Sequence, residues 1–158
     1  MGKSLQNIKL KHFILDVDGV LTDGKFLYSS EGKIYKTFGP HDSDGLKLIC
    51  AHIQIEFISA DKRGFLISKK RVEDMGFKIK LVSENNRYNY VKEYGFKNTI
   101  YMGDGIYDAD IIRDVAFGIA PKNAREEAKK YADFITENNS SEGAVLDACL
   151  EIKKKFIN

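Results

Sequence analysis

The sequence predicts an α/β protein built on a doubly wound, Rossmann-like, mostly parallel sheet with helices on both faces. The observation that leads to this class is that short apolar runs alternate with longer helical patterns along the 158 residues. One pair of runs breaks the alternation and is predicted to form a hairpin. Strand–helix alternation is typical of parallel sheets, because parallel neighbours need crossover connections. The length suits one hydrophobic core, so we expect a single domain over residues 1–158.

Individual elements follow from the periodicity of apolar residues. Strands are predicted at 12–16, 53–59, 80–83, 99–102, 115–119 and 133–136. Helices are predicted at 43–51, 63–75, 85–94, 106–114, 123–131 and 142–156. A β-hairpin is predicted at about 25–38, because two short runs there flank the turn sequence Ser-Ser-Glu-Gly.

Composition excludes several classes of function. The formal net charge is only +2 and no basic stripe is interleaved with aromatics, so we expect no nucleic-acid partner. No apolar run is long enough to span a membrane, and residues 1–11 lack the apolar core of a signal peptide. The two cysteines lie outside any CxxC motif and fit a reducing compartment. We therefore expect a cytoplasmic protein with no membrane partner.

Acidic residues follow the predicted strands at their carboxyl ends. Asp16 and Asp18 lie two apart after the first strand, Asp104 follows the strand at 99–102, and Asp108 opens the next helix. Ligands of open parallel sheets bind at this edge. Gathered carboxylates repel each other and need a cation, and an all-oxygen set favours Mg²⁺. The alternative, that each aspartate merely caps a helix or shapes a turn, explains any one of them but poorly explains all.

These residues carry a family resemblance. The segments DVDGVLTDG at 16–24 and GDGIYD at 103–108, with Ser59 between them, resemble the motifs of the haloacid dehalogenase-like hydrolases. Within that superfamily the chain is most similar to the small capless phosphatases of the 3-deoxy-D-manno-octulosonate 8-phosphate phosphatase group, whose flap the hairpin matches. Only about forty residues separate Asp16 from Ser59, which leaves no room for a cap domain.

The resemblance implies a Mg²⁺-dependent phosphomonoester phosphatase that acts through an aspartyl-phosphate. Asp16 would be the nucleophile, and Asp18 would protonate the leaving group and later activate water. Mg²⁺ would be held by Asp16, by the backbone carbonyl of Asp18 and by Asp104, with Asp108 as an indirect partner.

The resemblance also implies a phosphate-binding set. Ser59 would donate its hydroxyl group, and the backbone amide of Ala60 could join it. The family usually places a lysine at the start of the helix after the third strand, but Arg87 is the nearest cation here. Arginine can bind phosphate bidentately; the alternative is that Arg87 lies on a solvated helix face. His41 either contacts substrate near the flap or caps a helix.

Departures from the family pattern bear on the substrate. They occur near His41, at Asp61 in the Ser-Ala-Asp segment, and at Leu146, where an arginine is usual. We therefore expect a phosphorylated sugar or related intermediate of bacterial surface-polysaccharide biosynthesis, other than octulosonate 8-phosphate. Octulosonate 8-phosphate itself is an alternative.

Other interpretations concern function class and assembly. A receiver-like signalling domain also has paired acids after its first strand, and a catalytically silent binding subunit could share the fold. The motifs GDGxxD and DxDG favour the phosphatase over both. Alternating aromatics on the hairpin, at Tyr28, Tyr35 and Phe38, are typical of a packed surface, and the resemblance implies a homotetramer that closes the active site.

Overall fold

Both faces of the central sheet are covered, because its strands direct apolar side chains to alternate sides. In β1 (His12–Asp16), Phe13 and Leu15 pack into one hydrophobic core and Ile14 packs into the other. The computed structural model describes residues 9–157 and contains a sheet of order β5-β4-β1-β6-β7-β8. All of its neighbouring strands are parallel, so the predicted fold class is confirmed.

The remaining strands of this sheet overlap the predicted segments, and the strand predicted at 80–83 begins and ends two residues earlier. They are β4 (Gln54–Ser59), β5 (Lys78–Leu81), β6 (Thr99–Met102), β7 (Phe117–Ala120) and β8 (Phe134–Ile135). The strand β7 begins two residues later than predicted, because Val115 still closes the preceding helix through a hydrogen bond to Ile111.

Four helices lie within the predicted ranges with shorter ends, whereas the helices predicted at 43–51 and 85–94 lie two residues and one residue earlier in the chain. They are α1 (His41–Ile49), α2 (Phe65–Asp74), α3 (Glu84–Glu93), α4 (Ala109–Asp114), α5 (Glu126–Lys129) and α6 (Ala144–Ile152). A 3₁₀ turn at Ile106–Asp108 precedes α4, and a wider turn at Lys153–Ile157 follows α6. The helix α5 begins late because Arg125 is extended and donates its N–H to the carbonyl of Asp104.

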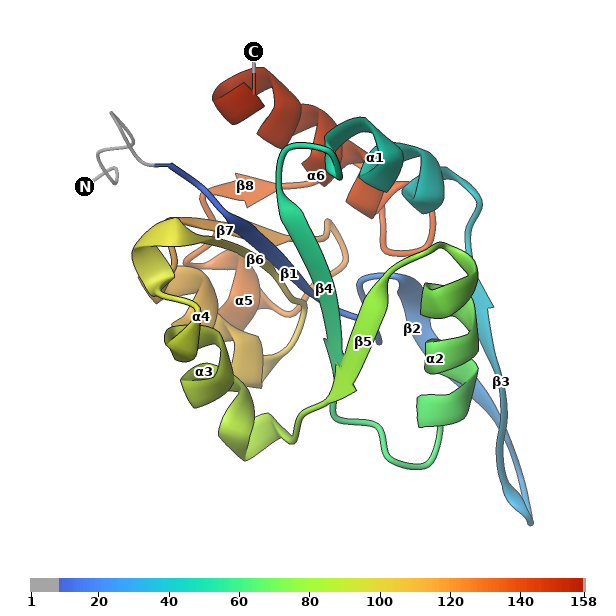
Figure 1. The fold of residues 1–158 in the computed structure, drawn as a ribbon. Helices are drawn as coiled ribbons and strands as arrows, with labels where there is room; N and C mark the ends of the chain where they lie inside the picture. Colours follow the sequence, from blue (N-terminus) through green and yellow to red (C-terminus); the bar gives the residue numbers. More distant parts are fainter. Residues whose placement is uncertain (1–8, 158) are drawn as a thin grey trace.

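The helices form two layers around the sheet (Figure 1). One core contains Leu46 from α1, Val72 from α2 and Val145 from α6. The other contains Val91 from α3 and Ile111 from α4, together with Ala128 from α5. Apart from the edge strand β5, where Lys78, Lys80 and Leu81 are exposed, the sheet is largely buried on both faces. Its carboxyl edge is therefore the place where loops can form a site.

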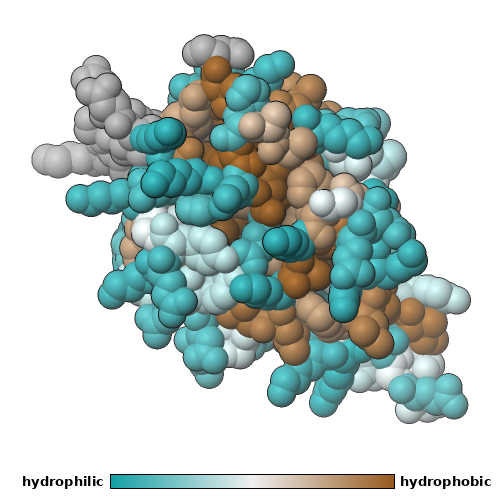
Figure 2. All heavy atoms as spheres, in the orientation of Figure 1, coloured by the Kyte–Doolittle hydropathy of each residue, from teal (hydrophilic) through white to brown (hydrophobic). Residues whose placement is uncertain are grey.

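The predicted hairpin is present and projects from the body beside α2 (Figure 1). Its strands β2 (Thr22–Ser29) and β3 (Gly32–Phe38) pair antiparallel and form a sheet of their own. Between β1 and β4 the chain holds only this hairpin and α1, so the described residues include no cap domain. Figure 2 shows hydrophobic atoms exposed on the hairpin at the lower right.

The structure tests the expected absence of a membrane span within its described residues, but it does not test the expected absence of a signal peptide. Residues 1–8, which form most of the segment considered for a signal peptide, lie outside the described range. Within residues 9–157, no helix has the length and apolar character needed to cross a membrane.

Candidate active site

Strand register brings three loops together at the carboxyl edge of the sheet. Asp16 pairs with Ile58 of β4, and Leu15 pairs with Met102 of β6. The loop after β1 therefore lies between the loop at Ser59 on one side and the loop at Asp104 on the other. This is the convergence that the sequence predicted for the acidic residues.

Three carboxylates meet in this position. Oxygen atoms of Asp16, Asp104 and Asp108 all lie within 4.8 Å of one another, the kind of arrangement that can hold a metal ion. Gly19 permits the close approach: its φ is +80°, and a Cβ atom there would lie 2.0 Å from Oδ2 of Asp104. A side chain at this position would therefore displace a carboxylate of the cluster.

Arg87 lies inside the site rather than on a solvated helix face. It enters from α3, is only 4% exposed, and donates Nη1 to Oδ2 of Asp16 at 3.2 Å and to Oδ1 of Asp108 at 2.6 Å. Burial alone would lower the pKa of Arg87, but Asp16, Tyr101 and Asp108 outweigh burial and raise it. The guanidinium is thus a permanent positive charge beside Asp16.

Asp108 is held by donors from the protein on both of its oxygens. Oδ1 accepts from Arg87 and from the hydroxyl of Tyr101 at 2.5 Å, while Oδ2 accepts the backbone N–H groups of Asp104 at 3.0 Å and Gly105 at 2.8 Å. Tyr101 was missed from the sequence, although a tyrosine in a buried strand needs a partner for its hydroxyl. Asp108 therefore fixes the loop that carries Asp104.

The cluster carries more negative than positive charge. Burial raises the pKa of Asp104 to about 7, with Asp108 adding to the effect and Arg87 opposing it. Burial also raises the pKa of Asp16 well above its ordinary value, against the pull of Arg87. Three carboxylates facing one guanidinium, with oxygen as the only donor element, fit a hard divalent cation such as Mg²⁺.

Asp18 does not join the three carboxylates. Its side chain turns toward the hairpin, where the ammonium of Lys36 lies 2.8 Å from Oδ1 and 3.1 Å from Oδ2. The hydroxyl of Ser59 lies 3.4 Å from Oδ2 on the same side and also accepts the backbone N–H of Asp61. The structure thus places Asp18 and Ser59 side by side, on the flank of the cluster that faces the hairpin.

The hairpin supplies charged groups that sequence reasoning missed. Asp61 accepts hydrogen bonds from Lys33 at 2.6 Å and lies 2.8 Å from the ammonium of Lys36. Burial alone would raise the pKa of Asp61, but these two lysines outweigh burial and hold it at about 2. The strand pattern gave no signal for Lys36, because Ile34, two residues earlier on β3, is 40% exposed and does not mark an inward face.

A pocket of about 560 Å³ opens over this edge, a size ordinary for small-molecule sites. Its lining combines predicted and unpredicted residues: Asp16, Asp18, Phe26, Lys33, Ala60, Asp61, Lys62, Arg63, Glu84, Arg87, Asp104, Gly105, Tyr107 and Asp108. Lys62 and Arg63 follow Ala60 and add cations on the side of β4.

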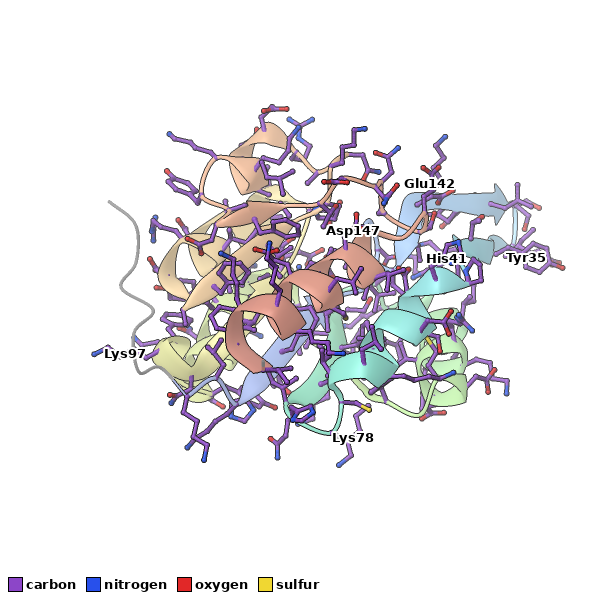
Figure 3. All side chains as sticks on the ribbon, turned by 90° about the horizontal axis from the view of Figure 1, so that it is seen from above. Tyr35, His41, Lys78, Lys97, Glu142 and Asp147 are labelled. Atoms are coloured by element: carbon purple, nitrogen blue, oxygen red, sulfur yellow. The ribbon has the colours of Figure 1, made fainter. Side chains whose placement is uncertain are left out.

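Three residues considered for phosphate or substrate recognition lie outside this lining: Ser59, which is fully buried, His41 and Leu146. Figure 3 shows His41 at the beginning of α1, near the base of the hairpin that carries Tyr35 outward. Leu146 lies on α6 and packs against Gly45 of α1. Within one chain, neither His41 nor Leu146 borders the pocket.

Comparisons with known proteins agree with this fold. The family model described as haloacid dehalogenase-like hydrolase matches residues 84–148. The 3-deoxy-D-manno-octulosonate 8-phosphate phosphatase of Haemophilus influenzae is 32% identical over 151 residues, covering 91% of this chain and 82% of the relative. The chain therefore belongs to the haloacid dehalogenase-like hydrolases. Within them it is a phosphatase of the capless kind.

Solved structures show the same relationship. The octulosonate 8-phosphate phosphatase of Moraxella catarrhalis, crystallised with a magnesium ion, a phosphate ion and a KDO molecule, is 30% identical. It superposes with a TM-score of 0.79 over 92% of this chain and 86% of the other. The cobalt-bound enzyme of Haemophilus influenzae is 27% identical, with a TM-score of 0.80 over 92% of this chain and 88% of the other. This family membership removes the receiver-like alternative.

We predict that Mg²⁺ binding weakens as the pH falls below 7. The pKa of Asp104 is raised to about 7, so below that pH a proton competes with the cation for this carboxylate. One displaced proton predicts a rise in the dissociation constant of about tenfold between pH 8 and pH 6. Isothermal titration of the metal-free protein at both pH values measures it. Asp104→Asn should bind weakly at both, and equal constants for the unaltered protein would contradict the assignment.

Proposed function

We propose that this protein is a Mg²⁺-dependent phosphomonoester phosphatase that forms an aspartyl-phosphate on Asp16. One observation carries the proposal: Asp16, Asp104 and Asp108 gather within 4.8 Å at the edge of the sheet, with Arg87 bonded to two of them. This arrangement offers a nucleophile, a divalent-cation site and a fixed positive charge at one place.

The proposed reaction has two steps. A carboxylate oxygen of Asp16 forms a bond to phosphorus while the ester P–O bond breaks, and Asp18 gives its proton to the departing oxygen. Asp18 then takes a proton from water, which attacks phosphorus and releases inorganic phosphate as the bond to Asp16 breaks. Asp18 suits both tasks because it flanks the pocket without belonging to the three-carboxylate cluster.

The remaining residues hold the phosphate and the cation. We assign the metal to Asp16, Asp104 and the backbone carbonyl of Asp18. Asp108 orients the loop of Asp104 by accepting its backbone N–H. Bound Mg²⁺ would offset the repulsion between the anionic nucleophile and the phosphate. Ser59, the amide of Ala60 and the guanidinium of Arg87 supply hydrogen-bond donors to phosphate oxygens.

The substrate is proposed from the relatives and from the pocket. The relatives are octulosonate 8-phosphate phosphatases, so that phosphorylated ketoacid sugar, an intermediate of surface-polysaccharide biosynthesis, is our first candidate. Lys62 and Arg63 on the pocket wall suit its carboxylate. A second candidate is another phosphorylated sugar of such a pathway, favoured by the departures at His41, Asp61 and Leu146.

A substrate panel tests the activity and ranks the two candidates. We expect Mg²⁺-dependent phosphate release from para-nitrophenyl phosphate, and a higher kcat/KM for octulosonate 8-phosphate than for hexose phosphates and phosphorylated nucleotide-sugar intermediates. Colorimetric detection of phosphate, with and without a chelator, measures both. If the protein released no phosphate from any substrate in the presence of Mg²⁺, the non-catalytic binding subunit would be favoured instead. A higher kcat/KM for another sugar phosphate would favour the second candidate.

Replacing the nucleophile should separate chemistry from folding. We expect Asp16→Asn to abolish turnover but to keep the thermal transition at or above that of the unaltered protein, because it removes one of three crowded carboxylates. Steady-state kinetics and thermal denaturation measure the two properties. Asp110→Asn, an exposed surface change on α4, is the matched control and should keep full activity. Residual turnover above about one per cent would place the nucleophile elsewhere.

The hairpin surface bears on how the protein assembles. The hairpin exposes five large apolar side chains: Phe26, Leu27, Tyr28, Ile34 and Tyr35. Tyr35 is 67% exposed, and an apolar surface of this kind supports a homotetramer whose hairpins cover neighbouring pockets. We also propose a cytoplasmic location, which the two free cysteines Cys50 and Cys149 support.

The assembly can be tested by removing hairpin contacts. We expect the unaltered protein to have the mass of four copies of its 17.9 kDa chain, and Tyr35→Glu to shift it to smaller species. Light scattering coupled to size-exclusion chromatography measures the mass. Leu150→Glu changes another exposed apolar side chain, on α6 away from the hairpin, and should leave the mass unchanged. A monomeric unaltered protein would refute the assembly but not the phosphatase.

A further inference from the structure

Lys36 is the most completely buried charge that the hairpin brings to the site. Its side chain has no exposed surface, although it comes from the projecting strand β3. An ammonium has three hydrogens to donate, and three acceptor groups surround this one. They are the carboxylate of Asp18, Oδ2 of Asp61 at 2.8 Å and Oγ of Ser68 at 2.8 Å.

The cluster is too closely packed to be incidental. Gly64, which directly precedes α2, lies against Asp61, Lys33 and Lys36. A Cβ atom at Gly64 would lie 2.3 Å from Oδ2 of Asp61 and 2.7 Å from side-chain carbons of Lys33 and of Lys36. The missing side chain therefore makes the space in which two ammonium groups approach one carboxylate.

Attachment of the hairpin does not by itself account for Lys36. Lys33 already joins the hairpin to Asp61 at 2.6 Å, and its ammonium lies 3.9 Å from the ring centre of Phe26 on the neighbouring strand. Of Lys33 and Lys36, only Lys36 donates a hydrogen bond to Asp18. Lys36 contacts both oxygens of that carboxylate, which restricts its rotation about the final side-chain bond.

We propose that Lys36 is a positioning residue of the phosphatase centre, which orients the Asp18 carboxylate for proton transfer. The inference rests on the proposed role of Asp18 as acid and base. Asp18 is a third exposed and follows the strand on a loop, so without a partner its carboxylate would sample several orientations. Lys36, with Ser59 beside it, holds one orientation at the pocket wall.

The test is a double-variant cycle read in kcat. In a protein whose Mg²⁺-dependent hydrolysis of para-nitrophenyl phosphate is established, Lys36→Met should lower kcat by about 10- to 100-fold with little change in KM, because misplacing a catalytic group costs about this much. Combined with Asp18→Asn, it should cause no further loss beyond about twofold, because it acts only through Asp18. The proposal would be overturned if the double variant lost kcat by the product of the two single-variant factors.

Lys33→Met is the matched control. The substitution removes the other ammonium group that contacts Asp61, and Lys33 does not contact Asp18. Whatever loss of kcat Lys33→Met causes by itself, that loss should multiply with the loss caused by Asp18→Asn. If the effect of Lys33→Met instead vanished with Asp18→Asn, as expected for Lys36→Met, general loosening of the hairpin would explain the loss of kcat in both lysine variants. Thermal denaturation and Mg²⁺ titration confirm that each variant is folded.

A second variant covers the case in which the methionine protein does not fold. Lys36→Gln can still donate to Asp18 but cannot reach three acceptors as an ammonium does. We expect a smaller loss of kcat that again vanishes with Asp18→Asn, and an unchanged kcat would overturn the proposal. An unaltered protein that releases no phosphate would refute the phosphatase itself, which distinguishes the two failures.

Discussion

The site depends on an excess of negative charge that the fold buries at one edge of its sheet. Asp16, Asp104 and Asp108 would repel each other strongly, since the protein interior screens charge poorly. Arg87 balances only part of this charge, and backbone N–H groups with the hydroxyl of Tyr101 fix Asp108. The remaining imbalance is what gives the edge its affinity for a divalent cation and makes that affinity sensitive to protons.

A second set of charges lies next to the first and has the opposite balance. Lys33 and Lys36 from the hairpin face Asp61 and Asp18, and here the opposite charges are matched in number. Asp18 stands at the boundary, with its backbone in the loop of the acidic cluster and its carboxylate in the balanced one. A group that must both give and accept a proton is well placed between a site of excess charge and a site of compensated charge.

The sequence was informative where chemistry and chain order coincide. Strand alternation, the hairpin and the acids after β1 and β6 were all predicted, because each depends on local periodicity or on residues adjacent in the chain. Arg87 was identified only as the nearest cation, because its burial depends on how α3 packs. Lys36 was missed because Asp18 and Ser68, which accept its hydrogen bonds, lie 18 and 32 residues away in sequence. Tyr101 was missed because its contact with Asp108 depends on how the chain turns back after β6. The pairing of Asp18 with the hairpin, rather than with Asp16, could not be derived from spacing, because the extended geometry ends at Asp16 and Asp18 lies in a turn over residues 17–20.

The hairpin begins at Thr22, a few residues after Asp18, and returns Lys36 to that same carboxylate. The flap that walls the pocket and the group proposed to move protons are thus neighbours along the chain as well as in space. Recombination or loop grafting that exchanges this hairpin between relatives would replace part of the reacting centre along with the pocket wall. In this architecture, exchanging the hairpin would change turnover and substrate preference together.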